Sequence, residues 1–175
     1  MYYDNEFALT TNDNKSAMKA LEALKNILHS GFECDSDYTH APSTQLLNAL
    51  FVEDNKITVP QNFYCSLPED SEGVFNVLLK SLSETFEDNF NCEIYSYCDY
   101  TECEVSAIHK DGVLKITETY YPSGCWETTV CEECGTEVPF DLYNPDQHII
   151  CPDCGEKIDL SECLAVVTEH VYGAK

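Results

Sequence analysis

Basic residues are scarce in this sequence. Lysine and arginine together number 9 against 32 aspartates and glutamates, which gives a formal net charge of -23 at pH 7. A protein that binds duplex DNA must neutralise phosphates that occur about every 1.7 Å along the helix axis. The shortage of cations therefore argues against direct nucleic-acid binding, and it favours either a basic partner surface or simply high solubility.

Long apolar runs are also missing. No stretch of eighteen apolar residues occurs, so no membrane-spanning helix is expected. Residues 1–6 are neither basic nor apolar, and no secretory signal peptide is expected. The eleven cysteines are an odd number in a chain too long for a typical secreted disulfide scaffold. Together these features predict a cytoplasmic protein with mostly reduced, buried cysteines.

Catalytic sequence motifs are absent too. We find no phosphate-binding glycine-rich loop, no Gly-x-Ser-x-Gly and no His-Glu-x-x-His. The five histidines are scattered, and His148 is expected to be a surface strand residue. We therefore assign no catalytic residue and expect a protein that is not an enzyme.

Two Cys-x-x-Cys-Gly segments are the clearest chemical signal present. Their cysteines are Cys131, Cys134, Cys151 and Cys154. Structural zinc takes four deprotonated soft ligands in a tetrahedron, with Zn–S distances of about 2.3 Å. Gly135 and Gly155 follow the two pairs, where a glycine can leave the turn with positive φ. Because cysteine fills all four positions, the metal has no open coordination site, which favours a structural role over a catalytic one.

Residues 129–160 resemble the zinc knuckles of zinc ribbons, and the resemblance implies one structural Zn²⁺ held by the four cysteines. The same spacing is also similar to rubredoxin, which would imply iron. Rubredoxin's intervening loop is longer, however, and its aromatic core residues are missing here. A pair of dithiol redox motifs would need a thioredoxin-like context, which we do not find.

The hydrophobic pattern predicts an α+β fold. Apolar residues at helical spacing predict helices over about 15–30, 43–52 and 72–88, the second with Phe51 facing inward. Strands are expected near 1–10, 57–59, 92–99, 102–109 and 113–121, while 33–42 is expected to be a loop and 61–70 irregular. The predicted architecture is an antiparallel sheet with about three helices on one face, plus a C-terminal zinc ribbon. The order of elements also faintly resembles ferredoxin-like domains.

A hairpin at Lys110-Asp111-Gly112 sets the register of two of these strands. Pairing residue 110 with 113 separates a buried face from a wet one, with Ile108 as the apolar exception on the wet face. The buried face is then Cys103, Val105, Ala107, Leu114 and Ile116.

Residues 122–126 mark a boundary between an α+β domain over 1–122 and a zinc-ribbon module with a terminal strand over 123–175. Ribbon strands are expected at 128–130, 137–142 and 147–150. The last strand, 164–172, is either a third ribbon strand or an edge of the main sheet.

Tyrosines and acids alternate along the strand near residue 95 and its neighbour. The candidate partner-binding residues are Glu93, Tyr95, Tyr97, Asp99, Glu102 and Glu104, continued by Tyr100, Tyr120 and Tyr121. One interpretation is an ordinary solvated sheet face. The other is a contact surface, because tyrosine is favoured in interfaces and carboxylates can bind a partner's lysines and arginines.

In size, acidity and general character the chain resembles phage-encoded anti-CRISPR proteins, some of which are acidic and act on Cas9. The resemblance implies an inhibitor in the host cytoplasm that binds a basic surface of Cas9 and prevents target-DNA loading. Two other functions stay open: a zinc-ribbon adaptor or regulator of transcription or replication machinery, and a rubredoxin-like electron carrier.

Overall fold

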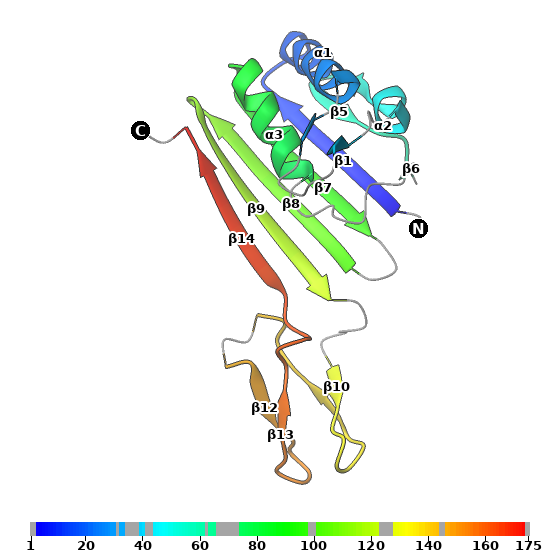
Figure 1. Ribbon diagram of the computed structural model, residues 1–175, viewed down its shortest axis with the longest axis vertical. Helices are drawn as coiled ribbons and strands as arrows, with labels where there is room; N and C mark the ends of the chain where they lie inside the picture. Colours follow the sequence, from blue (N-terminus) through cyan, green and yellow to red (C-terminus); the bar gives the residue numbers. More distant parts are fainter. Residues whose placement is uncertain are drawn as a thin grey trace.

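The computed structural model describes residues 3–30, 32–33, 39–40, 44–61, 63–65, 74–97, 101–122, 128–143 and 146–173. It has an α+β fold in which a twisted antiparallel sheet carries helices on one face, and a slender module extends from one end of the sheet (Figure 1). We call the sheet with its helices the body, and residues 128–160 the ribbon module. Among the described residues no helix is both long enough and apolar enough to cross a bilayer.

Among the described residues, eight antiparallel strands form the sheet of the body. Their order is β14-β9-β8-β7-β1-β5-β4. Both β5 and β6 pair with β1, β5 with residues 8–10 and β6 with residues 3–5. The strands are β1 (Tyr3–Thr11), β4 (Phe51–Glu53), β5 (Lys56–Thr58), β6 (Phe63–Cys65), β7 (Phe90–Tyr97), β8 (Thr101–Lys110), β9 (Val113–Pro122) and β14 (Val166–Tyr172).

In the part of the chain that the structure describes, three helices lie on one face of this sheet, as predicted: α1 (Asn14–Ser30), α2 (Thr44–Ala49) and α3 (Val74–Thr85). Asp13 caps α1, because its Oδ1 accepts a hydrogen bond from the Ser16 backbone N–H at 2.7 Å. That bond lowers the pKa of the Asp13 carboxyl below its ordinary value. The second helix is shorter than predicted: Phe51 begins β4 and is 42% exposed, so its expected inward position is wrong.

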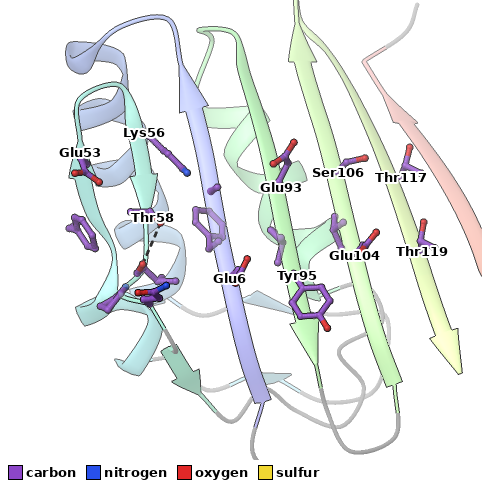
Figure 2. Close-up of a pocket in the computed structure, with 18 residues that line it drawn as sticks. Glu6, Glu53, Lys56, Thr58, Glu93, Tyr95, Glu104, Ser106, Thr117 and Thr119 are labelled. Atoms are coloured by element: carbon purple, nitrogen blue, oxygen red, sulfur yellow. Dashed lines mark hydrogen bonds between the residues drawn. The ribbon is translucent and has the colours of Figure 1, made fainter. Parts of the chain in front are cut away.

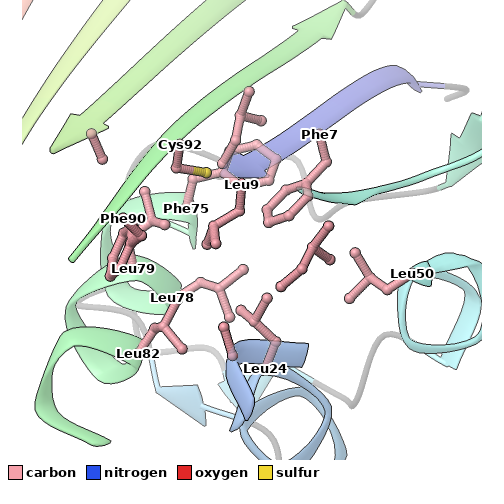
Figure 3. Packing of buried hydrophobic residues seen from close by; sticks show 14 of the residues in the cluster. Phe7, Leu9, Leu24, Leu50, Phe75, Leu78, Leu79, Leu82, Phe90 and Cys92 are labelled. Carbon is pink, nitrogen blue, oxygen red and sulfur yellow. The ribbon is translucent and has the colours of Figure 1, made fainter. Parts of the chain in front are cut away.

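The core lies between the sheet and the helices. Phe7 and Leu9 alternate on β1, and Leu78, Leu79 and Leu82 follow one face of α3 (Figure 3). Each such side chain contributes about 1.5–3 kcal/mol when fully buried. The apolar residues of each element thus repeat at that element's own period and lie on one face of it. The two apolar faces pack together and form one continuous apolar layer.

The predicted β8–β9 hairpin is confirmed in its register. Lys110 pairs with Val113, and the five residues assigned to the buried face are all buried. Ile108 is 55% exposed on the opposite face. Asp111 and Gly112 both have positive φ, as the tight turns that suit strand twist require.

Short strands occur where the sequence predicted none. β2 (Phe32–Glu33), at the start of the expected loop, pairs with β3 (Thr39–His40) inside it, and β6 lies inside the segment expected to be irregular. Strands of two or three residues are too short for an alternation of apolar and polar residues to be recognised.

The ribbon module consists of two small hairpins, β10 (Thr128–Val130) with β11 (Glu137–Pro139), and β12 (His148–Ile150) with β13 (Lys157–Asp159). The first outgoing strand ends at Pro139 rather than at residue 142. Of the two positions expected for the last strand, the structure has the edge of the main sheet: β14 pairs with β9 over seven residues. The ribbon module is thus inserted between two neighbouring strands of the body.

The end of β14 fits closely against the β8–β9 turn. Gly173 has φ 79°, and a Cβ at this position would lie 2.3 Å from the Gly112 carbonyl oxygen. Only glycine allows the two backbones to approach this closely.

Candidate metal centre and acidic sheet face

The four predicted cysteines form one cluster. Their sulfur atoms all lie within 4.8 Å of one another. Cys131 Sγ is 3.5 Å from Cys154 Sγ, and Cys134 Sγ is 3.6 Å from Cys151 Sγ. Four sulfurs placed tetrahedrally about 2.3 Å from a metal lie about 3.8 Å apart. The cluster therefore has the donor set and dimensions to coordinate a metal ion.

Each cysteine pair is held by the same local turn. The Gly135 N–H donates to the Cys131 carbonyl at 2.8 Å, and the Gly155 N–H donates to the Cys151 carbonyl at 3.0 Å. Both glycines have positive φ, 74° and 78°, as their positions predicted. Cys131 and Cys151 are buried, whereas the second cysteine of each pair is exposed. The two hairpins thus present their sulfurs to one point from opposite sides.

The Cys134 Sγ donates to the Thr136 hydroxyl oxygen, 3.2 Å away, and contacts with the Thr136 side chain and then its backbone lower the pKa of Cys134 to about 6. At Cys154 the backbone N–H of Glu156 lowers the pKa, but the neighbouring thiols and partial desolvation outweigh it and raise the pKa to about 12. Thiolates held this close together repel one another. A bound cation removes that repulsion.

Thr136 also joins the two hairpins, because its hydroxyl donates to Asp153 Oδ2 at 2.7 Å. Such outer contacts orient ligands around a metal. His148 lies in β12 with its Nδ1 near the Asp146 carbonyl, and among the described residues it is not part of the cysteine cluster.

Five of the six candidate partner-binding residues share the face of the sheet that the helices leave uncovered, which we call the open face. Tyr95 pairs with Glu104 and Tyr97 with Glu102, so these four lie together, and Glu93 precedes Tyr95 by two residues on the same side. The sixth, Asp99, lies outside the described residues, as does Tyr100.

Other tyrosines divide between the two faces. Tyr120 is half-buried against the core on the covered face, so its place in the contact surface is wrong. Tyr121 lies on the open face, where its hydroxyl donates to Glu104 Oε2 at 3.2 Å and lies 2.9 Å from the hydroxyl of Tyr143. The Tyr143 bond, followed by burial and the Glu104 charge, raises the pKa of Tyr121. This contact connects the ribbon module to the open face.

A broad hollow of about 900 Å³ lies in the open face, between β4 and β9 (Figure 2). We call it the acidic hollow. Its charged lining residues are Glu6, Glu53, Lys56, Glu93 and Glu104. In the part of the chain that the structure describes, no ion pair involves Glu6, Glu93 or Glu104. Glu104 accepts a hydrogen bond from Tyr121, and no lysine of the described residues neutralises these three carboxylates.

Sequence reasoning missed Glu6 and Glu118. Glu6 became part of the hollow only through the pairing of β1 with β7, which no local pattern reveals. Glu118 is buried on the covered face, with Oε2 3.1 Å from His170 Nε2, and its Oε1 has no hydrogen-bond partner among the described residues. Glu118 follows Leu114 and Ile116 at intervals of two residues on the same strand, so strand alternation could have predicted that Glu118 faces the core.

The structure thus has two candidate sites. One is the four-thiol cluster of the ribbon module, and the other is the acidic hollow of the body, which also carries tyrosine. No protein-family model, curated protein or solved structure matches the chain.

Proposed function

We propose that this chain is a non-enzymatic acidic protein that binds a basic surface of a nucleic-acid-processing protein. The acidic hollow carries the proposal, because Glu6, Glu93 and Glu104 gather there and take part in no ion pair among the described residues. The net charge of -23 adds a long-range attraction toward a basic partner and steers the encounter.

The metal centre has a structural role in this proposal, and zinc is the proposed ion. Four thiolates leave no open coordination position for chemistry, and they suit Zn²⁺ in size and softness. Metal analysis of purified protein should give about one zinc per chain. A red, iron-loaded preparation would instead support the rubredoxin-like electron carrier.

In its most specific form, the proposal is a phage-encoded anti-CRISPR protein that prevents Cas9 from loading target DNA in the host cytoplasm. Cas9 holds the guide–target duplex in a positively charged channel. An acidic face is complementary in charge to such a channel, and the size and acidity of the chain support this choice of partner.

The test uses guide-loaded Cas9 with the full chain. We expect binding at low salt that weakens as salt is raised, together with loss of target-DNA binding by Cas9. No binding at low salt rules out Cas9 as the target. A direct shift of DNA by the chain itself would contradict the charge argument for the whole proposal.

A zinc-ribbon adaptor of transcription or replication machinery is the second candidate. Val130 and Ile150 favour it, because they lie on ribbon strands and are 55% and 57% exposed. Where exposed apolar side chains form one contiguous patch, the patch marks a protein-interaction site. Binding that is lost in Val130→Ser with Ile150→Ser, but retained when the hollow is neutralised, would support the adaptor.

A further inference from the structure

Tyr95 lines the acidic hollow. Glu6 and Glu104 are its direct cross-strand partners on β1 and β8, and Glu93 lies two residues before it on β7. Neighbouring strands are about 4.8 Å apart, so all three carboxylates can reach the space above the tyrosine ring. Figure 2 shows these four side chains projecting from three adjacent strands on the same side of the sheet.

The same pairing of tyrosine with glutamate recurs two residues further along. Tyr97 is 42% exposed and pairs with Glu102 on the neighbouring strand β8. Residues two apart on a strand are separated by roughly 6.8 Å, which is also the distance between alternate side chains of any extended chain. Tyr121, the cross-strand partner of Glu102 on β9, donates a hydrogen bond from its hydroxyl to Glu104.

This arrangement suits a guanidinium group more than an ammonium group. Guanidinium is planar, stacks on an aromatic face and forms paired hydrogen bonds with carboxylates. The chain contains no arginine of its own. The matching cation must therefore come from a partner, and the net charge of -23 opposes both nucleic acid and a second copy of this chain as that partner.

We propose that the open face binds an extended protein segment with arginines at alternate positions, lying along β7 so that its guanidinium groups stack on Tyr95 and Tyr97. This inference rests on the proposed function and specifies the chemistry that the hollow recognises. The partner would be held by stacking and paired hydrogen bonds in addition to its overall charge.

The binding test uses labelled synthetic peptides and fluorescence anisotropy with the full, metal-loaded chain. One peptide carries two arginines separated by a single serine. Three others replace both arginines by lysine, replace both by neutral citrulline, or place the two arginines side by side. We expect the alternating arginine peptide to bind best, the lysine and adjacent-arginine peptides several-fold more weakly, and the citrulline peptide not to bind.

Variants of the hollow then locate the binding. Tyr95→Ala should weaken the alternating arginine peptide roughly 3- to 30-fold, the range expected for a cation–π contact, whereas Tyr95→Phe keeps the ring and should bind normally. Glu93→Gln with Glu104→Gln should abolish binding. The matched control is Glu132→Gln with Glu133→Gln, which changes the net charge equally at two exposed residues of the ribbon module.

The outcomes separate this inference from the proposed function. Equal weakening by both glutamine pairs, equal affinity for arginine and lysine peptides, or an unchanged affinity in Tyr95→Ala would overturn arginine recognition while leaving a basic partner possible through net charge alone. Failure of every cationic peptide and of every basic protein partner would overturn both. Thermal melts of the variants check that each remains folded.

Discussion

The body and the ribbon module are stabilised by different physical means. The body buries a continuous layer of side chains from a sheet and helices, including Leu9, Leu24 and Leu79 at 0% exposure. Among the described residues, the ribbon cluster has Cys131, Val138 and Cys151 as buried members, with Ile149 and Ile158 packed against them, and Phe140 and Leu160 are also buried in the module. A unit this small buries little apolar surface, so a metal held by the four cysteines would add stability that the body does not need. The body should therefore tolerate loss of the metal, whereas the ribbon module should not.

Removing a metal ligand should give the largest effect on this contrast. We expect Cys131→Ser to lose the metal and unfold the ribbon module, because apparent zinc-binding free energies at such sites are about 10–16 kcal/mol. Hydrogen exchange should show rapid exchange of ribbon amides while those of α1 and β1 stay protected. The matched control is Cys163→Ser, a half-buried cysteine outside the cluster. Protected ribbon amides in Cys131→Ser would contradict a structural metal.

A cavity in the body should have the converse effect. Leu79 is fully buried in α3, so Leu79→Ala should lower the free energy of unfolding of the body by about 2–5 kcal/mol. Metal content should not change. Met18→Ala serves as a control, because Met18 is 54% exposed and its truncation should have little effect. Loss of metal in Leu79→Ala would show that the two regions fold as one unit.

Removing the hydrogen bond between the two hairpins should have an intermediate effect on metal affinity, and the effect should be confined to the ribbon module. Thr136→Val keeps the shape of the side chain but removes the hydroxyl that contacts Cys134 and Asp153. We expect metal affinity to fall about 10-fold in competition with a chelator, as for other contacts that orient ligands. Thr128→Val, at an exposed position of β10, is the control. Equal affinities for the two variants would leave Thr136 without a role at the metal.

Helix capping should give the smallest effect, and it depends on pH. Asp13→Ala removes the cap of α1 and should lower the melting temperature by about 2–4 °C near neutral pH. Because the folded-state pKa of Asp13 is lowered, its stabilisation is present above the ordinary carboxyl pKa and is lost as pH falls through the lowered one.

Asp13→Asn keeps an acceptor but cannot titrate, so the melting-temperature gap between this variant and Asp13→Ala should not depend on pH. Asp159 makes a comparable bond within the ribbon module, to the Ser161 N–H at 2.8 Å. Asp159→Ala should leave the melting of the body unchanged. A pH-independent gap between the wild type and Asp13→Ala would contradict the capping argument.

Sequence reasoning succeeded where the determinants are local. The four cysteines, the helix expected over about 15–30 and the Lys110–Val113 register are all set by residues close in the chain. It failed or stayed open where long-range pairing decides. Neither the addition of Glu6 to the hollow nor the place of β14 beside β9 can be read from a short window. Phe51 shows a third cause: an apolar residue just after a helix was assigned to its buried side, although the chain had already turned into a strand.

The insertion of the ribbon module between β9 and β14 has a consequence for the order of folding. The segment between β9 and β14 contains both hairpins of the ribbon module, so this whole segment must form a closed loop before β14 can pair with β9. Closing a long flexible loop costs entropy that grows with its length and slows the pairing of distant strands. A metal that draws the hairpins together shortens this loop before β14 arrives. Metal loading should therefore accelerate completion of the sheet. When metal is scarce, the pairing of β14 with β9 should become a late, slow step of folding.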